Sequence, residues 1–119
     1  MNFTIDSSVI VASLRTQEKA HKKSKVFLEQ IIEGKHIAYE SAIVPVEVTA
    51  AIRRRTGSRK LASRVKQNLF NVNSLNFYEL SRFRMELAAR IAEETSLKGM
   101  DAIVVQIAQE KDTALVTLD

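Results

Sequence analysis

Four acidic residues stand at corresponding places in this sequence, beside runs that favour strands or begin helices. They are Asp6, Glu47, Asp101 and Asp119. Asp6 and Asp119 each follow a short run of β-branched, aromatic or aliphatic residues, whereas Glu47 and Asp101 stand near expected helix starts. Carboxylate oxygens are the ligands that Mg²⁺ and Mn²⁺ favour, and such ions activate water and neutralise charge at phosphate esters. If the fold brings these acids together, they could support metal-assisted hydrolysis of a phosphodiester.

Each acid also has an ordinary structural explanation. Asp6 and Asp101 are suited to capping helices. Glu47 is expected in the first turn of a helix that begins at Pro45, where it would oppose the positive end of the helix dipole. Asp119 would simply end a strand in solvent. The coincidence of all four favours a shared site, since clustered anions repel one another and a divalent cation relieves that repulsion.

Two hydroxyl groups adjoin the first and last of these acids. Ser8 lies two residues after Asp6, and Thr117 lies two residues before Asp119. Either could hold a water or a phosphate, although capping and turn formation are the commoner roles of such hydroxyls. Both are therefore candidate supporting residues.

The elements that would position these residues alternate between strand and helix. Strands are predicted near residues 3–5, 36–39 and 114–119, and residues 71–77 are predicted to form a turn followed by a weak strand. Helices are predicted near residues 8–14, 18–33, 45–56, 58–70, 79–95 and 102–108. This alternation predicts an α/β fold, a three-layer α/β/α sandwich with a central parallel sheet. Right-handed connections would place the strand-to-helix corners, and hence the four acids, at one edge of the sheet.

Composition narrows the class of protein and the kind of metal. The chain has 119 residues, of which 45% are hydrophobic and 27% charged, so we expect a single domain over residues 1–119. It has no cysteine and only two histidines, which argues for a metal held by oxygen rather than a thiolate zinc site. Without a long apolar run or a signal peptide, we expect a cytoplasmic protein that does not contact a membrane.

Positive charge is concentrated between residues 53 and 66, a segment that we call the basic stripe. Its cations are Arg53, Arg54, Arg55, Arg59, Lys60, Arg64 and Lys66. The whole chain carries a net charge of +4, so the remainder is net −3 once these seven charges are removed. A local basic stripe on a mildly acidic protein suggests a nucleic-acid partner, the alternative being the solvated face of a helix.

Taken in order, these segments give the whole chain a resemblance to the PIN-domain ribonucleases, the fold of VapC-type toxins of type II toxin–antitoxin systems. The resemblance rests on residues 5–10 (IDSSVI), 44–48 (VPVEV) with Arg53 and Arg54 beyond them, 101–108 (DAIVVQIA) and 115–119 (LVTLD). Each pattern is weak alone, and the four in this order and spacing are fairly specific. PIN domains normally continue past the fourth acid to an edge strand, so we expect a shortened C-terminal end that lacks this last strand.

The resemblance implies an endoribonuclease that cleaves single-stranded RNA with Mg²⁺ or Mn²⁺. It implies a catalytic, metal-binding quartet of Asp6, Glu47, Asp101 and Asp119, supported by Ser8 and Thr117. We expect RNA to bind at Arg53, Arg54, Arg55, Arg59 and Lys60. The resemblance further implies a homodimer and a small antitoxin partner.

Two other classes of function remain to be weighed. A non-catalytic RNA-binding or scaffold domain of the same fold would keep the basic stripe without needing a metal. A receiver-like domain with a phospho-accepting aspartate also gathers acids at strand ends. A receiver-like domain is less favoured, because the sequence has neither paired acids after the first strand nor a lysine after a final strand to complete a phosphorylation site.

Overall fold

The computed structural model describes residues 1–118 and contains four strands and six helices within that range. The strands are β1 (Asn2–Ile5), β2 (Ile37–Ser41), β3 (Leu75–Tyr78) and β4 (Ala114–Val116). The helices are α1 (Ser7–Leu14), α2 (His21–Ile32), α3 (Ile43–Thr56), α4 (Arg59–Phe70), α5 (Arg82–Thr95) and α6 (Gly99–Lys111). No helix within this range is long and apolar enough to span a membrane.

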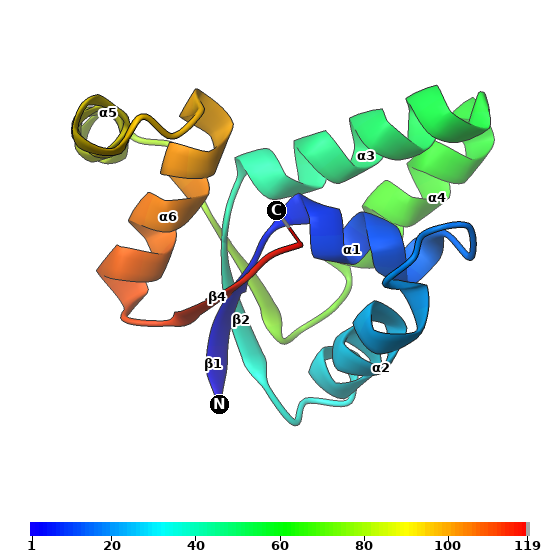
Figure 1. Cartoon of the computed structure of the whole chain (residues 1–119). Helices are drawn as coiled ribbons and strands as arrows, with labels where there is room; N and C mark the ends of the chain where they lie inside the picture. Colours follow the sequence, from blue (N-terminus) through cyan, green and yellow to red (C-terminus); the bar gives the residue numbers. More distant parts are fainter. Residues whose placement is uncertain (119) are drawn as a thin grey trace.

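The four strands form one parallel sheet in the order β3-β2-β1-β4. Helices cover both faces, with α1 to α4 on one side and α5 and α6 on the other (Figure 1). The chain runs outward from β1 to β3 and then returns to the opposite side of β1, so the strand order reverses between β1 and β4. Ligands of open α/β sheets bind outside the carboxyl ends of the strands at such a switch point. The predicted parallel α/β fold is thus confirmed.

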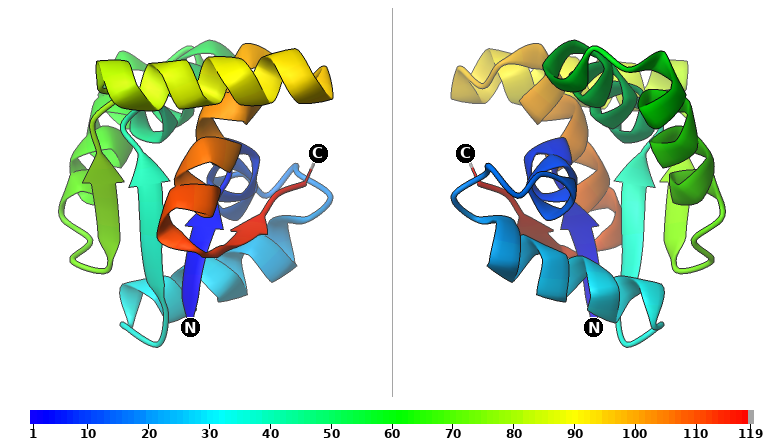
Figure 2. Two further views of the ribbon diagram at one scale, coloured as in Figure 1. Left: turned by 90° about the vertical axis from the view of Figure 1, so that its left-hand side faces the viewer. Right: turned by 90° about the vertical axis from the view of Figure 1, so that its right-hand side faces the viewer.

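The main hydrophobic core lies between the sheet and helices α1 to α4. Ile5 of β1 and Ala38 of β2 face α1 and α3 there, with Ile10 and Val48 fully enclosed. On the other face, α6 packs against β1 and β2. Figure 2 shows α5 lying above the carboxyl ends of the strands, joined to the molecule mainly through α6.

The start of one helix differs from the sequence prediction. Helix α3 begins at Ile43, two residues before Pro45, so Glu47 is its fifth residue and lies outside the first turn. Proline is accepted there because the first backbone N–H groups of a helix have no intrahelical acceptor. Helix α2 packs against α1 through one of its faces. Val26 and Ile32 are exposed, because Leu28 and Ile31 occupy the side that packs against α1.

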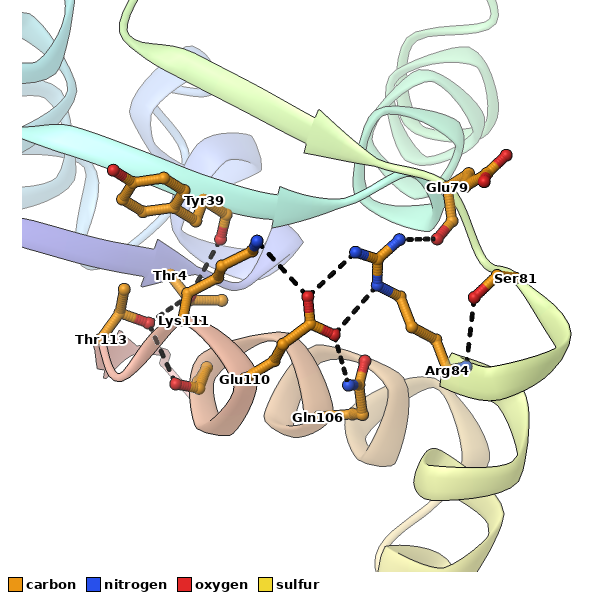
Figure 3. A network of polar contacts seen from close by, with 10 residues as sticks. Thr4, Tyr39, Glu79, Ser81, Arg84, Gln106, Glu110, Lys111 and Thr113 are labelled. Atoms are coloured by element: carbon orange, nitrogen blue, oxygen red, sulfur yellow. Dashed lines mark hydrogen bonds and ion pairs between the residues drawn. The ribbon is translucent and has the colours of Figure 1, made fainter.

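A polar network fixes α6 to the start of α5 (Figure 3). Both Arg84 nitrogens Nε and Nη2 bond to the Glu110 carboxylate, at 3.0 and 2.9 Å. The Gln106 amide donates to the same carboxylate at 3.0 Å, and Lys111 lies 3.4 Å from it. Because this arrangement is bidentate and charge-assisted, it is stronger than an ordinary surface ion pair.

Replacing Glu110 with glutamine is expected to lower the free energy of unfolding at pH 7 by about 1 kcal/mol. The pKa of Glu110 is lowered from 4.5 to about 2, first by the hydrogen bond from Arg84 and next by that from Gln106. A carboxyl whose pKa is lower in the folded state stabilises the protein above its unfolded pKa and loses this effect as the pH falls through its folded pKa. Urea unfolding should therefore show a difference between wild type and Glu110→Gln that is full above about pH 5 and vanishes toward about pH 2.

The matched control for this prediction is Glu86→Gln. Glu86 pairs with Arg82 one helical turn away, and both side chains are mostly exposed. Such a pair is worth only about 0.3–0.5 kcal/mol. An effect of equal size in both variants, unchanged between pH 7 and pH 3, would contradict the assignment.

Candidate metal-binding site

Asp6 lies at the carboxyl end of β1, where the strand order reverses. Its backbone N–H donates to the Val116 carbonyl of β4 at 2.9 Å, and the residue is only 7% exposed. It occupies the N-cap position of α1, yet its side chain accepts no capping hydrogen bond. The carboxylate oxygen Oδ2 accepts hydrogen bonds from the hydroxyls of Ser8 at 2.7 Å and Thr117 at 3.1 Å. The capping explanation therefore does not account for this carboxylate.

The hydroxyl cluster ties the end of β4 to the start of α1. Ser8 Oγ also accepts the Leu118 backbone N–H at 3.2 Å, so it bridges Asp6 and the segment after β4. Within residues 1–118, the hydrogen bonds of the Asp6 carboxylate all reach Oδ2. This leaves Oδ1 as the oxygen that can bind a cation.

Asp101 shares a cavity with Asp6. The cavity has a volume of about 210 Å³. Its lining residues are Asp6, Leu97, Asp101, Val104, Val105, Leu115 and Thr117. Asp101 is the third residue of α6 and not its N-cap, which is Lys98. An acid in the first turn faces the positive end of the helix, so its charge is favoured there. The polar side chains that line this cavity all carry oxygen atoms that can coordinate a metal ion.

Glu47 approaches the same corner from α3. The Ser7 hydroxyl donates to Glu47 Oε1 at 3.4 Å, a long hydrogen bond that joins α3 to the residue next to Asp6. The fourth predicted ligand, Asp119, lies outside the described residues. Within residues 1–118, no three acidic or imidazole side chains stand close enough together to hold one ion. The structure therefore brings Asp6 and Asp101 to one cavity and Glu47 to a neighbouring hydroxyl.

Glu40 is an acid near the site that the sequence analysis missed. It lies on β2, is fully buried, and accepts the Ile5 backbone N–H at 2.8 Å through Oε1. Burial raises the pKa of its carboxyl well above the ordinary value, the Ile5 hydrogen bond opposes this, and the negative charge of Asp6 adds to the rise. Strand alternation could have revealed it, since Glu40 shares the inward face of β2 with Ala38.

The seven cations of the basic stripe are all exposed, the first three at the end of α3 and the other four on α4. Arg55 is already paired, with Nη1 at 2.7 Å from Glu18 Oε1. Arg53, Arg59 and Lys66 line a groove between α3 and α4. The cations of the basic stripe therefore differ in their surroundings: Arg55 is paired with an acid, whereas Arg53, Arg59 and Lys66 face a common groove.

The groove between α3 and α4 reaches the first turn of α3. Pro45 and Val46 line it there, directly before Glu47. At the far end of α4, Phe70 contributes an exposed aromatic ring to the lining. An extended ligand lying in this groove would thus run from the cations of the basic stripe toward Glu47.

Three solved structures with a similar fold are a toxin and two toxin–antitoxin complexes. The VapC20 toxin of Mycobacterium tuberculosis, described as cleaving the sarcin–ricin loop, matches with a TM-score of 0.82 and 16% identity, over 100% of this chain and 90% of that one. VapBC2 of Rickettsia felis, bound to a DNA fragment from its promoter, matches with a TM-score of 0.72 and 14% identity, over 100% of this chain and 88% of that one. A toxin–antitoxin complex from Klebsiella pneumoniae matches with a TM-score of 0.67 and 20% identity, over 100% of this chain and 87% of that one.

The parallel four-stranded sheet with helices on both faces is the α/β fold of these VapC structures. The chain belongs to the PIN domain family, whose model matches residues 3–119. Comparison with curated proteins gives no match.

The oxygen donors of the cavity suit a hard divalent cation. Mg²⁺ is typically held by one or two carboxylates, with waters and phosphate oxygens completing an octahedron. Asp6 and Asp101 supply two carboxylates, and Thr117 adds a hydroxyl to the same cavity. Among residues 1–118, neither a histidine nor a sulfur atom lines this cavity, which is consistent with Mg²⁺ or Mn²⁺ rather than a softer metal.

Proposed function

We propose that this protein is a metal-dependent endoribonuclease that cleaves single-stranded RNA and serves as the toxin of a toxin–antitoxin pair. The observation that carries the proposal is the pair of carboxylates, Asp6 and Asp101, on one cavity at the switch point of a PIN-family sheet. The likeness in fold to VapC structures supports the assignment.

In this proposal, the residues around Asp6 prepare a site for Mg²⁺ or Mn²⁺. Asp6 and Asp101 would be the principal ligands, and Glu47 and Asp119 would complete the site or orient waters. The hydroxyls of Ser8 and Thr117 fix the Asp6 carboxylate by donating to Oδ2. When bound, the ion would supply an activated water and neutralise charge on the scissile phosphate.

The basic stripe would bind the RNA. Arg53, Arg59 and Lys66 face the groove that extends to Pro45 and Val46, directly before Glu47, so they would hold successive phosphates on the approach to the acids. Arg54 and Lys60 are exposed beside them and would add positive charge outside the groove. Arg55 would contribute less than the sequence predicted, because Glu18 already neutralises part of its charge.

The proposal also includes protein partners. Two of the similar structures contain a toxin together with an antitoxin, which supports a small antitoxin for this chain. We further propose a homodimer. Size-exclusion chromatography with light scattering, on the chain alone and co-expressed with the product of its neighbouring gene, would measure both assemblies.

The experiment that tests the function is cleavage of a labelled single-stranded RNA. We expect cleavage with Mg²⁺ or Mn²⁺, none with a chelator, and little on duplex RNA. Calorimetric titration with Mn²⁺ should show binding that depends on the carboxylates. RNA binding without cleavage or metal binding would instead support a scaffold domain.

Replacing Asp101 with asparagine is expected to reduce cleavage about 10- to 100-fold or more, since even residues behind the first ligands of a metal commonly cost that much. Weaker Mn²⁺ binding should accompany the loss. The matched control is Glu93→Gln, which neutralises an exposed acid on α5. Equal activity in Asp101→Asn and Glu93→Gln would remove Asp101 from the proposed site.

A further inference from the structure

The ladder between β1 and β2 is shorter than either strand. Its paired residues are Asn2 with Ile37 and Phe3 with Ala38, and the ladder ends there. Beyond this point β2 continues to pair with β3 as far as Ser41. The backbones of β1 and β2 therefore stop bonding just before the carboxyl end of β1, where Asp6 lies.

Side chains take over where this ladder ends. The Thr4 hydroxyl donates to the Tyr39 carbonyl at 2.8 Å, and the Ile5 N–H donates to Glu40 Oε1 at 2.8 Å. On the opposite side, the Asp6 N–H donates to the Val116 carbonyl of β4. Two consecutive backbone groups at the end of β1 are thus held from opposite sides, by a side chain of β2 and by the main chain of β4.

Burying the Glu40 carboxyl group at this position costs folding free energy. It is completely enclosed, and its second oxygen, Oε2, has no hydrogen-bond partner within residues 1–118. An unsatisfied buried polar atom costs about 1–3 kcal/mol, and an ionised buried carboxylate costs more. The raised pKa favours the neutral acid, whose carbonyl oxygen can still accept the Ile5 N–H. An apolar side chain would remove the cost of the unpaired Oε2 but would leave the buried Ile5 N–H without its acceptor, so the Glu40 carboxyl serves this one backbone group.

We propose that Glu40 is a positioning residue for Asp6, which holds the carboxyl end of β1 by accepting the Ile5 N–H where the β2 backbone no longer does so. This inference deepens the proposed function and rests on it, since Asp6 is a principal ligand in that proposal. Glu40 acts through the backbone of Ile5 and need not touch metal or RNA. Its role is to keep the Asp6 carboxylate at a fixed place beside Asp101.

Two substitutions separate the hydrogen bond from the packing. Glu40→Gln keeps an acceptor at the same position, whereas Glu40→Met has a similar length but offers no oxygen to Ile5. We expect Glu40→Gln to retain wild-type Mn²⁺ affinity and cleavage. We expect Glu40→Met to weaken Mn²⁺ binding and lower kcat about tenfold or more, as for other residues that orient metal ligands. KM should change little, because the basic stripe is untouched.

A readout without metal or RNA tests the positioning directly. Amide hydrogen exchange of Ile5, measured by NMR, should be as slow in Glu40→Gln as in wild type and at least about tenfold faster in Glu40→Met. Val65→Ala, a core substitution in α4, is the control for general destabilisation. It should lower the melting temperature without changing the Mn²⁺ affinity of the folded protein.

The outcomes decide between the two proposals separately. Wild-type Ile5 exchange and Mn²⁺ affinity in Glu40→Met would overturn the role of Glu40, as would equal losses in Glu40→Gln and Glu40→Met. Should Glu40→Met not fold, the through-bond coupling between the Ile5 nitrogen and the Glu40 carboxyl carbon in wild type decides the matter, and its absence would overturn the inference. Lack of RNA cleavage by the wild type would overturn the nuclease proposal alone, since Ile5 exchange needs no substrate.

Discussion

Replacing Asp6 with asparagine is expected to abolish most RNA cleavage, with a loss of about 100-fold or more at saturating Mn²⁺. The physical reason is that the asparagine side chain supplies no negative charge at the switch point, although its amide oxygen can still accept the hydroxyl hydrogen bonds from Ser8 and Thr117. The rate of cleavage of a labelled single-stranded RNA measures the effect. Because those hydroxyl contacts are retained, the fold should survive the change.

Thermal unfolding provides a second reading of the same variant. Without metal, Asp6→Asn should melt at or slightly above the wild-type temperature, because it removes a negative charge near Asp101 and Glu47. Added Mn²⁺ should raise the melting temperature of wild type and have little effect on the variant, since a ligand stabilises only the state that binds it. The control is Asp112→Asn, an exposed change at the C-cap of α6, where asparagine accepts the positive φ of 52°. Equal cleavage by Asp6→Asn and Asp112→Asn would refute the proposed site.

The second large effect is expected in RNA binding, when the three groove cations are removed together. The variant is Arg53→Ala, Arg59→Ala and Lys66→Ala, and all three side chains are exposed on helices that tolerate alanine. Affinity for single-stranded RNA should fall at least about tenfold, and the slope of log K against log salt should lose about two units. Fluorescence anisotropy in the presence of a chelator, over a series of salt concentrations, measures both without cleavage.

A matched triple variant on α2 tests whether position matters as well as charge. Lys22→Ala, Lys23→Ala and Lys25→Ala remove the same number of exposed cations from a helix outside the groove. We expect a much smaller loss of affinity and salt slope. If the two triple variants behave alike, the basic stripe is a solvated helical face rather than a binding surface.

The elements that carry the site could be predicted in order and in type. The β-branched run before Asp6 and the apolar run after Asp101 dictate a strand and a helix by local preference alone. Their boundaries were less accurate, as α3 shows. Pro45 does lie in the first turn of α3, as predicted, but the helix begins two residues earlier, at Ile43. Its start depends on contacts of Ile43 and Val44 with the core, which the local sequence does not reveal.

What the sequence by itself determined is therefore the alternation of strands and helices and the presence of acids at their corners. The tertiary structure alone decided which acids share a cavity, because the strand order puts β4 beside β1 and brings Thr117 to Asp6. It also decided that Arg55 is paired and that the Glu40 carboxyl accepts the Ile5 N–H at the end of β1. These outcomes depend on contacts between residues far apart in the chain, which local pattern and propensity do not encode.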